Sequence, residues 1–543
     1  MEYTFCISDE QNAFSTIFYF SKKIKKGSNL SLFSEVSFLD TETLFVQQES
    51  LSIPSDTSVK KSLSKRAKME RFLYESDDVK SILLWLENFS IPNKNLTRKS
   101  LEPLLLKTIS ELDVMIEKQI NSILHHKQFQ ALEASWRGLA YIIDQKETQD
   151  KEDKSKIKVL NCSWKTLSKD FDKSIEFDQS AFYKLVHSNE YDTSGGEPFG
   201  VIIGDYQVSH KPQKGLKTND IDTLKDISRV AAASFSPFIT SADSSLFSVD
   251  DYSGLGSYIN WSKNFEQPEY SKWRALRDMD ESRFIGITVP NILMRKPYKE
   301  DGTRKEGFKF KESIKDPQKD HLWGNAAYAF SGVLLRAFSE SGWFGQIRGM
   351  EPGFRTKGLV CDLPAAQFEN EKYQKNSKPS VNLQIGDKSE KILSDNGFIP
   401  IIPVKGCEHL VFFSNASVQK AKQYNSLAAT VNSKLSTMLQ YIFCVSRFAH
   451  YLKILGREKL GTYSSAELCE RDLQKWLHQY TASGDSTSDS VRCKYPLYSG
   501  QVKVKEMVGK PGSYYSIIQL QPHFQLDQMI SSIRLVTEFT PQH

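Results

Sequence analysis

The sequence predicts a multidomain α+β fold, with mixed sheets, flanking helices and a C-terminal strand cluster. Three observations predict it. The chain has 543 residues, which is too long for one ordinary hydrophobic core. Patterns typical of helices and of strands both occur along it, and no period of about 20–50 residues repeats, which excludes a solenoid. From about residue 499 onward, apolar and polar side chains alternate in short runs.

Helical periodicity is strongest between residues 101 and 143. Apolar residues recur there at intervals of three and four, first in one stripe and then on a second face. The stripe holds Ile109, Leu112, Ile116, Ile120 and Ile123, and the second face holds Leu132, Trp136, Leu139 and Ile143. Further helices are expected over residues 70–89, 221–235, 432–455 and 466–480.

Two interior segments are predicted to be strands. Residues 201–206 form a short apolar run that ends in a turn, and residues 284–290 end at Pro290. Polar residues dominate 146–158, 299–320 and 367–395, which are predicted to be loops or insertions. A Ser/Thr/Lys-rich stretch over 50–64 is predicted to be a linker.

Three short strands are predicted at the C-terminus, with turn residues between them. The candidate subunit-interface residues on these strands are Val502, Val504, Tyr514, Ile517, Leu520, Ile533 and Leu535. Free strand edges and apolar residues on both faces are costly to leave in water. The strands therefore either complete the chain's own sheet, as consecutive strands commonly do, or pair with strands of other subunits.

Charge and cysteine content exclude several classes of function. The formal net charge of +5 comes from 71 basic and 66 acidic residues, so no nucleic-acid binding is expected. Seven scattered cysteines without a C-x-x-C pair favour free thiols in a reducing compartment over a zinc site. The start lacks a secretory signal pattern and no apolar run reaches about 18 residues, so we expect a cytoplasmic protein without membrane insertion.

The common catalytic motifs do not occur in this sequence. The sequence lacks G-x-x-x-x-G-K-[ST], H-E-x-x-H and G-x-S-x-G, so no catalytic residue, cofactor or metal site is predicted. His125 and His126 are adjacent, and adjacent side chains on a helix point about 100° apart. That arrangement favours a histidine satisfied at a helix end over a pair of metal ligands.

A charged cluster lies between residues 274 and 283. Its members are Arg274, Arg277, Asp278, Asp280, Glu281 and Arg283. Alternating signs over so short a stretch favour a structural network of salt bridges within the protomer. A general acid/base site of a hydrolase is the alternative interpretation of the same residues.

Ordered blocks of residues occur across about 100–540. They are Leu132–Leu139, Glu190–Tyr191 with Gly195–Gly200, Pro237–Ile239, Trp273–Asp278, Ser282–Pro290, Arg295–Tyr298, Leu322–Phe330, Gly397–Pro400, Phe412–Ser414, Arg447–Lys453, Arg457–Thr462, Pro511–Tyr515 and Pro522–Phe524. In this order they closely resemble the large sheath subunit of bacterial type VI secretion systems, the TssC/VipB family. So many ordered blocks are more specific than any single motif.

The resemblance implies a contractile-sheath protomer of the bacterial cytoplasm that is not an enzyme. It implies a small sheath subunit (TssB/VipA type) as partner, further copies of the chain in a helical lattice, an inner tube protein, a baseplate and an AAA+ disassembly ATPase. Contraction of such a sheath drives the tube and its effectors out of the cell. The C-terminal strands would then pair with strands from neighbouring protomers. A tailocin- or phage-type contractile sheath is the alternative within this class.

The resemblance also divides the chain into three parts. Residues 1–96 form a divergent N-terminal arm and linker, residues 97–490 form the sheath core, and residues 491–543 form the C-terminal strand-exchange segment. The core either is one domain or consists of two interleaved domains. Residues 1–60 depart from the family pattern, so no helix that binds the ATPase is assigned there. Val36–Gln47 is the candidate for an N-terminal strand exchanged between subunits. On the amphipathic segment 466–480, Glu470 and Asp472 are expected to contact the inner tube, by similarity to contractile sheaths.

Overall fold

The computed structural model describes fourteen stretches of the chain. They are residues 16–19, 21–22, 70, 72–87, 98–210, 219–257, 261–299, 308–351, 356–367, 377–405, 407–458, 466–482, 489–506 and 514–523. The predicted linker over 50–64, the candidate strand over 36–47 and the third C-terminal strand with Ile533 and Leu535 lie outside these stretches. The chain divides into two compact units, Met1–Ile24 with Gln119–His543 and, separately, Lys25–Lys118. The domain boundaries predicted at 96 and 490 stay predictions.

The described part of the smaller unit is helical. Helix α2 spans Asp78–Glu87, and α3 spans Arg98–Leu124, so that its last turns belong to the larger unit. The predicted stripe lies on α3, which confirms the long helix. Its side chains in the smaller unit are largely exposed: Ile109 by 52%, Leu112 by 46% and Ile116 by 44%. An apolar stripe of this kind is typical of a helix that packs against a partner.

An eight-stranded mixed sheet forms the centre of the larger unit, in the order β10-β14-β13-β7-β6-β5-β1-β4. Its strands are β1 Thr16–Tyr19, β4 Val159–Asn161, β5 Ile202–Val208, β6 Phe238–Ala242, β7 Ile285–Val289, β10 Leu359–Val360, β13 Ile399–Pro403 and β14 Leu410–Phe412. The four central strands β5, β6, β7 and β13 run parallel, so their carboxyl ends meet at one edge. Antiparallel strands flank them on both sides.

Of the strands of this sheet, the sequence predicted β5 and β7 only, and β1 is the unpredicted strand that lies farthest from the rest in sequence. It pairs antiparallel with β4 and with β5, so that Phe18 lies opposite Val159 and Ile203. Residues 16–19 therefore belong to the central sheet, although they fall within the segment predicted as an N-terminal arm. Four residues without clean alternation carry too little pattern to predict such a pairing.

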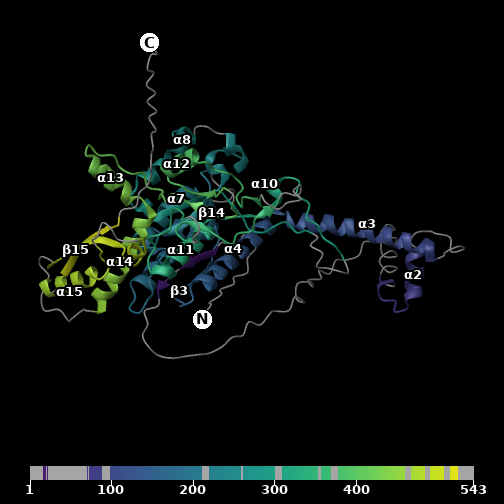
Figure 1. Ribbon diagram of the computed structural model, residues 1–543, viewed down its shortest axis with the longest axis horizontal. Coiled ribbons are helices and arrows are strands. Elements are labelled where there is room, and N and C mark those ends of the chain that lie inside the picture. The colour runs from purple at the N-terminus through teal and green to yellow at the C-terminus, as the bar shows by residue number, and fades with distance from the viewer. Residues whose placement is uncertain are drawn as a thin grey trace, which may run out of the picture. The chain divides into compact units, whose positions relative to one another are not determined.

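Helices cover both faces of the sheet, with α7 and α11 on either side of it (Figure 1). The helices of this layer are α4 Lys127–Gln149, α5 Trp164–Lys173, α6 Ala181–Tyr183, α7 Asp220–Ser234, α8 Trp261–Asn264, α9 Ser271–Asp278, α10 Pro317–Asp320, α11 Ala327–Ser341 and α12 Asp387–Asp395. Alternate side chains of β5 enter opposite cores: Ile202 joins the core that contains Ile227 of α7, whereas Ile203 joins the core that contains Phe330 of α11. The mixed α and β fold predicted from the sequence is thereby confirmed.

Short elements connect these layers. The short strands are β2 Ser21–Lys22, β3 Ser155–Lys156, β8 Ile292–Leu293, β9 Trp323–Gly324, β11 Ala366–Gln367 and β12 Ser377–Lys378. The short helical segments are η2 Phe177–Gln179, η3 Lys184–Tyr191, η4 Ser244–Phe247, η5 Tyr252–Ser257, η6 Pro268–Tyr270 and η7 Asp280–Phe284. At the α4–α11 contact, a Cβ on Gly138 would lie 2.4 Å from the ring of Tyr328, so this approach requires a glycine.

The C-terminal part of the larger unit has its own small core. Its elements are α13 Leu427–Ser436, α14 Leu439–Glu458, α15 Ala466–His478, α16 Asp489–Lys494, β15 Leu497–Glu506 and β16 Tyr514–Pro522. Trp343 stacks on Phe448 of α14 with ring centroids 4.4 Å apart, and Leu473 and Leu477 of α15 and Val502 of β15 complete the cluster. None of the described helices is long and apolar enough to cross a bilayer.

Four local predictions are wrong in part. The predicted loop over 299–320 ends in helix α10. Helix α4 extends to Gln149, into the predicted loop over 146–158. The predicted loop over 367–395 ends in helix α12. This helix buries only Leu393, so its sequence is mostly polar and resembles that of a loop. The single helix predicted over 432–455 is two helices, because residues 415–417 pair with the break: Ser417 N–H donates to Thr437 O, and Leu439 N–H donates to Asn415 O.

Candidate functional site

The C-terminal hairpin is the candidate assembly site. Strands β15 and β16 pair antiparallel along their length, from Leu497 opposite Pro522 to Glu506 opposite Tyr514, with an irregularity near Ser499. The first two predicted C-terminal strands are thus confirmed as strands. In the described part of the chain, these two strands form a sheet of their own.

One face of the hairpin is buried inside the protomer. Val502 is 2% exposed and Val504 8%, and both pack with Leu473 and Leu477 of α15. Ile518 and Leu520 are partly buried in the same cluster, whereas Ile517 is 50% exposed on the other face. The side chains of Val502 and Val504 therefore complete the chain's own core, which favours a role for the backbone edges in any contact between subunits.

Side chains of α15 occupy the outer edge of β15. Val502 N–H donates to Gln474 Oε1 at 2.7 Å, and Val504 N–H donates to Glu470 Oε2 at 2.9 Å. In return, Gln474 Nε2 donates to Gly500 O at 2.8 Å. These bonds satisfy the groups that an added strand would need, so β15 is closed to strand addition.

The outer edge of β16 differs from that of β15, since no described side chain bonds to it. Because Val502 and Val504 direct their N–H groups away from β16, their partners Ile518 and Ser516 belong to non-hydrogen-bonded pairs. In such pairs the N–H and C=O of both residues point outward. Ser516, Ile518 and, by the same register, Leu520 therefore present backbone donors and acceptors along an edge with which no described strand pairs.

The two acidic residues expected to contact a tube differ in their surroundings. Glu470 of α15 accepts the bond from Val504 N–H, so its carboxylate supports the hairpin. Asp472 is exposed on the same helix. Asp472 alone of the pair remains a candidate for an external contact.

The charged cluster at 274–283 is built mainly from arginines that bind backbone carbonyls. Arg274 Nη1 donates to the carbonyls of Phe265 and Gln267 at 2.7 Å each. Arg277 is 9% exposed; its Nε donates to Val418 O at 3.1 Å and its Nη2 to Asp395 O at 2.8 Å. Burial lowers the pKa of Arg277 to about 10. These bonds hold α9 against segments that are distant in the sequence. The sequence predicted salt bridges in this structural role.

The acidic members of the cluster lie at the surface. Asp278 is exposed. Asp280 Oδ1 accepts from Lys422 Nζ and Gln419 Nε2 at 3.1 Å each and lies 3.4 Å from Arg283 Nη2. The hydrogen bond from Lys422 lowers the pKa of Asp280, so this carboxyl is a poor proton donor or acceptor near neutral pH. The geometry disfavours the hydrolase interpretation of these residues.

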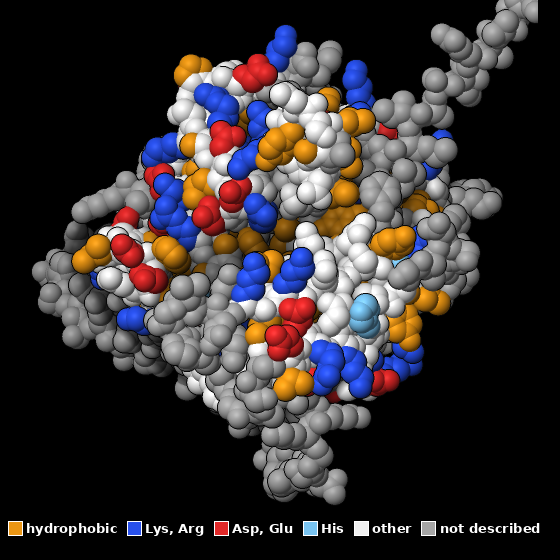
Figure 2. All heavy atoms as spheres, turned by 90° about the vertical axis from the view of Figure 1, so that its left-hand side faces the viewer, with side chains coloured by type: hydrophobic (Ala, Val, Ile, Leu, Met, Phe, Trp, Pro, Cys, Tyr) orange, Lys and Arg blue, Asp and Glu red, His pale blue; other side chains and the backbone are white. Residues whose placement is uncertain are grey.

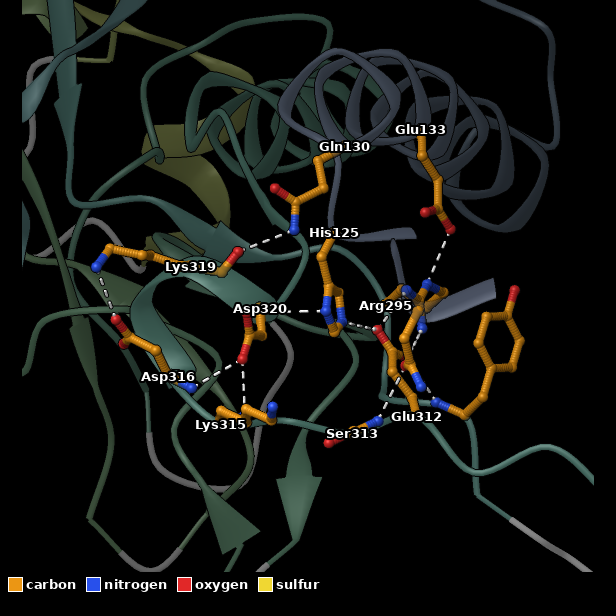
Figure 3. A network of polar contacts seen from close by, with 12 residues as sticks. His125, Gln130, Glu133, Arg295, Glu312, Ser313, Lys315, Asp316, Lys319 and Asp320 are labelled. Atoms are coloured by element: carbon orange, nitrogen blue, oxygen red, sulfur yellow. Dashed lines mark hydrogen bonds and ion pairs between the residues drawn. The ribbon is translucent and has the colours of Figure 1, made fainter. Parts of the chain in front are cut away.

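A second polar network joins the start of α4 to the segment that follows β8 (Figure 3). Arg295 and Glu312 form a two-pronged ion pair, with Nη1 to Oε2 at 2.5 Å and Nη2 to Oε1 at 3.0 Å. Arg295 Nε also donates to Glu133 Oε1 at 2.8 Å, and Tyr298 N–H donates to Glu312 Oε2 at 2.9 Å. His125 completes it, with Nε2 3.3 Å from Glu312 Oε1 and Nδ1 3.8 Å from Asp320 Oδ1.

This network is buried and carries charge. Burial alone would raise the pKa of Glu312, but hydrogen bonds from Arg295 and from Tyr298 N–H outweigh it and hold that pKa below its usual value. The prediction of a histidine satisfied at a helix end agrees with His125, which follows α3 directly. The pairing of Arg295 with Glu312 was missed, since no periodic pattern links them; the block Arg295–Tyr298 was the one signal available.

Comparison with known proteins assigns the chain to a class. Residues 106–419 match the family model VipB, described as the EvpB/VC_A0108 tail sheath N-terminal domain. Residues 428–539 match the model VipB_2, the EvpB/VC_A0108 tail sheath gpW/gp25-like domain. These two matched domains define a contractile-sheath protein, which is a structural class.

The chain belongs to the VipB/EvpB family, the large sheath subunits of type VI secretion systems. A relative from Pseudomonas aeruginosa, the type VI secretion system sheath protein TssC1, is 35% identical over 435 residues, which are 79% of this chain and 84% of that protein. The resemblance inferred from the ordered blocks is thereby confirmed, as is the prediction of a contractile-sheath subunit.

Two solved structures show weaker similarity. The anti-feeding prophage baseplate has 9% identity and a TM-score of 0.31, covering 58% of this chain and 66% of that one. The contracted PVC sheath complex of an extracellular contractile injection system has 10% identity and a TM-score of 0.31, covering 59% and 68%. TM-scores this low carry no weight, so the family assignment rests on the sequence matches.

Proposed function

We propose that copies of this chain pair with a small sheath subunit and join one another through the outer edge of β16, forming a helical sheath around an inner tube. Contraction of this sheath in the bacterial cytoplasm drives the tube toward its target. The single observation that carries the proposal is the backbone edge at Ser516, Ile518 and Leu520, with which no described strand pairs, next to a β15 edge that α15 closes. An edge of this kind accepts a strand from a neighbouring chain.

The small subunit has a candidate surface on α3. The exposed stripe with Ile109, Leu112 and Ile116 offers the apolar face that a partner helix would cover. Asp472 is the remaining candidate contact to the inner tube, where exposed ion pairs are individually weak and allow release on contraction. The baseplate and the AAA+ disassembly ATPase are further partners by likeness to the family.

A proline at Ser516 tests the proposal. Ser516 is exposed, and its N–H points away from β15, so Ser516→Pro removes one outward donor without breaking a bond inside the hairpin. We expect the variant to copurify with the small subunit at the wild-type ratio but to form no sheaths by electron microscopy. Ser516→Ala is the matched control, because it keeps the N–H and should assemble normally.

Ile517→Pro gives the contrasting result. Ile517 pairs with Lys503 through bonds inside the hairpin, so this variant should lose folded protein as well as assembly. If Ser516→Pro assembled into sheaths of normal length, the β16 edge would not join subunits, and the hairpin would merely complete the protomer's own fold.

A further inference from the structure

An exposed loop joins the two parts of the chain that match the two sheath domains. It spans residues 420–427, of which Leu427 begins helix α13, between the first match, which ends at 419, and the second, which begins at 428. Seven of its eight residues are exposed, all but Ala421. Tyr424 is 54% exposed and Leu427 81%. The loop carries two lysines and no acidic residue; Lys422 pairs with Asp280 at 3.1 Å, and Lys420 forms no ion pair among the described residues.

The backbone of this loop is held in place by helix α13. Lys422 N–H donates to Ser433 Oγ at 2.9 Å. Thr430 Oγ1 accepts from Tyr424 N–H at 2.9 Å and donates to Tyr424 O at 3.0 Å. A loop fixed in this way presents its side chains without a large entropic cost on binding. Figure 2 faces the side of the molecule on which α13 lies, and there hydrophobic side chains lie beside basic ones.

A cavity of about 930 Å³ lies elsewhere on the same unit, at the carboxyl edge of the parallel strands. Residues of β5, the segments that follow β6 and β7, the start of α4 and the α10 segment line it. Ligands of open parallel sheets bind at this edge, and the volume lies within the usual range of about 300–1,000 Å³. Four of its lining residues are labelled in Figure 3, where Gln130 donates to the carbonyl of Lys319 and His125 lies beside Asp320.

The cavity has the opposite charge to the loop and aromatic walls. Four aspartates line it (Asp243, Asp250, Asp251 and Asp320), against two lysines (Lys127 and Lys319). Asp205 also lines the cavity. Because burial raises the pKa of Asp205, this residue is left out of the count of negative charges. Trp164, Tyr252 and Trp323 supply the aromatic surface. Lysine side chains bind favourably against carboxylates and aromatic faces, and a tyrosine and a leucine need apolar walls.

We infer that the loop 420–427 of one copy of this chain enters the acidic cavity of the next copy in the sheath. Lys420 lies near Asp250, and Tyr424 and Leu427 pack against the aromatic walls. The loop and the cavity share no lining residue, so one copy can offer its loop to one neighbour and its cavity to another. A head-to-tail contact of this kind propagates as a helical lattice where its rotation does not close into a ring. The inference rests on the proposed sheath function and adds to it a second contact, separate from the β16 edge.

Charge exchange tests the contact. Lys420 and Asp250 are both exposed and form no ion pair among the described residues, so single reversals should leave the protomer folded. In chains coexpressed with the small subunit, Lys420→Glu and Asp250→Lys should each lower the fraction of sedimenting sheath about tenfold, because like charges then meet across the contact. The double variant carries the exchanged pair at every contact, and assembly should return to within about twofold of wild type.

Matched controls lie on the turn between β13 and β14. Lys405→Glu and Glu408→Lys make the same charge changes at exposed residues that line neither the cavity nor the loop, and they should assemble normally. A double variant that assembles no better than either single variant would overturn the inference.

Photocrosslinking identifies the occupant directly. Benzoylphenylalanine replaces Tyr424 in sheaths assembled from a mixture of ¹⁴N and ¹⁵N copies, so that mass spectrometry separates bonds within a copy from bonds between copies. The expected product joins residue 424 to 243–252 or 316–325 of a different copy. Crosslinks within one copy, or to another protein, would overturn the inference. If wild-type chains formed no sheath at all, the proposed function itself would fail.

Discussion

The ion pair of Arg295 and Glu312 gives a prediction whose size follows from the geometry. The side chains are 6% and 1% exposed, and Arg295 binds Glu133 as well as Glu312. Arg295→Met leaves Glu312 buried and charged, with His125 and Tyr298 N–H as its remaining partners. Loss of one partner from a buried pair costs about 3–5 kcal/mol of the free energy of unfolding.

The opposite deletion should cost less. Glu312→Gln keeps the bond from Tyr298 N–H, and Arg295 stays paired with Glu133 at 2.8 Å. We therefore expect a loss of about 1–3 kcal/mol, the usual cost of a weakened buried hydrogen bond. We expect Arg295→Met to be the worse variant. Glu133 supplies a second carboxylate for Arg295, whereas among the described residues no second arginine pairs with Glu312.

Urea unfolding of the full chain, coexpressed with its small subunit, measures both losses at pH 7.5 and at pH 5. The deficit of Arg295→Met should shrink at pH 5, because the lone buried Glu312 then has a raised pKa and takes up a proton more readily. An Arg295→Met variant within about 1 kcal/mol of wild type, or a Glu312→Gln variant that is the worse of the two, would refute the reasoning.

Two other predictions concern buried groups elsewhere in the larger unit. Burial lowers the pKa of His450 to about 3, so the unfolded chain binds a proton there below pH 6.5 and the folded chain does not. Stability should fall by about 2 kcal/mol between pH 6.5 and pH 5, and His450→Gln, which keeps a donor toward Ser234 O, should remove this slope in thermal unfolding. At the charged cluster, Asp278→Ala should change stability by less than about 0.5 kcal/mol because Asp278 is exposed. Arg277→Ala should cost about 2–4 kcal/mol because it leaves the carbonyls of Val418 and Asp395 without their donor; equal losses in urea unfolding would contradict this contrast.

The sequence by itself determined the elements with strong local patterns and the family. The three- and four-residue spacing predicted α3, short apolar runs predicted β5 and β7, and alternation predicted both strands of the hairpin. These features depend on neighbours along the chain, because amphipathic periodicity records which face of an element is buried. The ordered blocks gave the sheath family for the same reason, since each block is a local string.

Tertiary structure alone decided the contacts between distant residues. The place of β1 between β4 and β5, the carbonyl partners of Arg277 and the closure of the β15 edge by Glu470 and Gln474 have no local signature. Glu470 has the same charge and helix as Asp472, yet it bonds to Val504 while Asp472 faces solvent. Which backbone group a side chain reaches depends on how separate elements pack, and pairing across such separations is set by the three-dimensional fold instead of by any pattern along the chain.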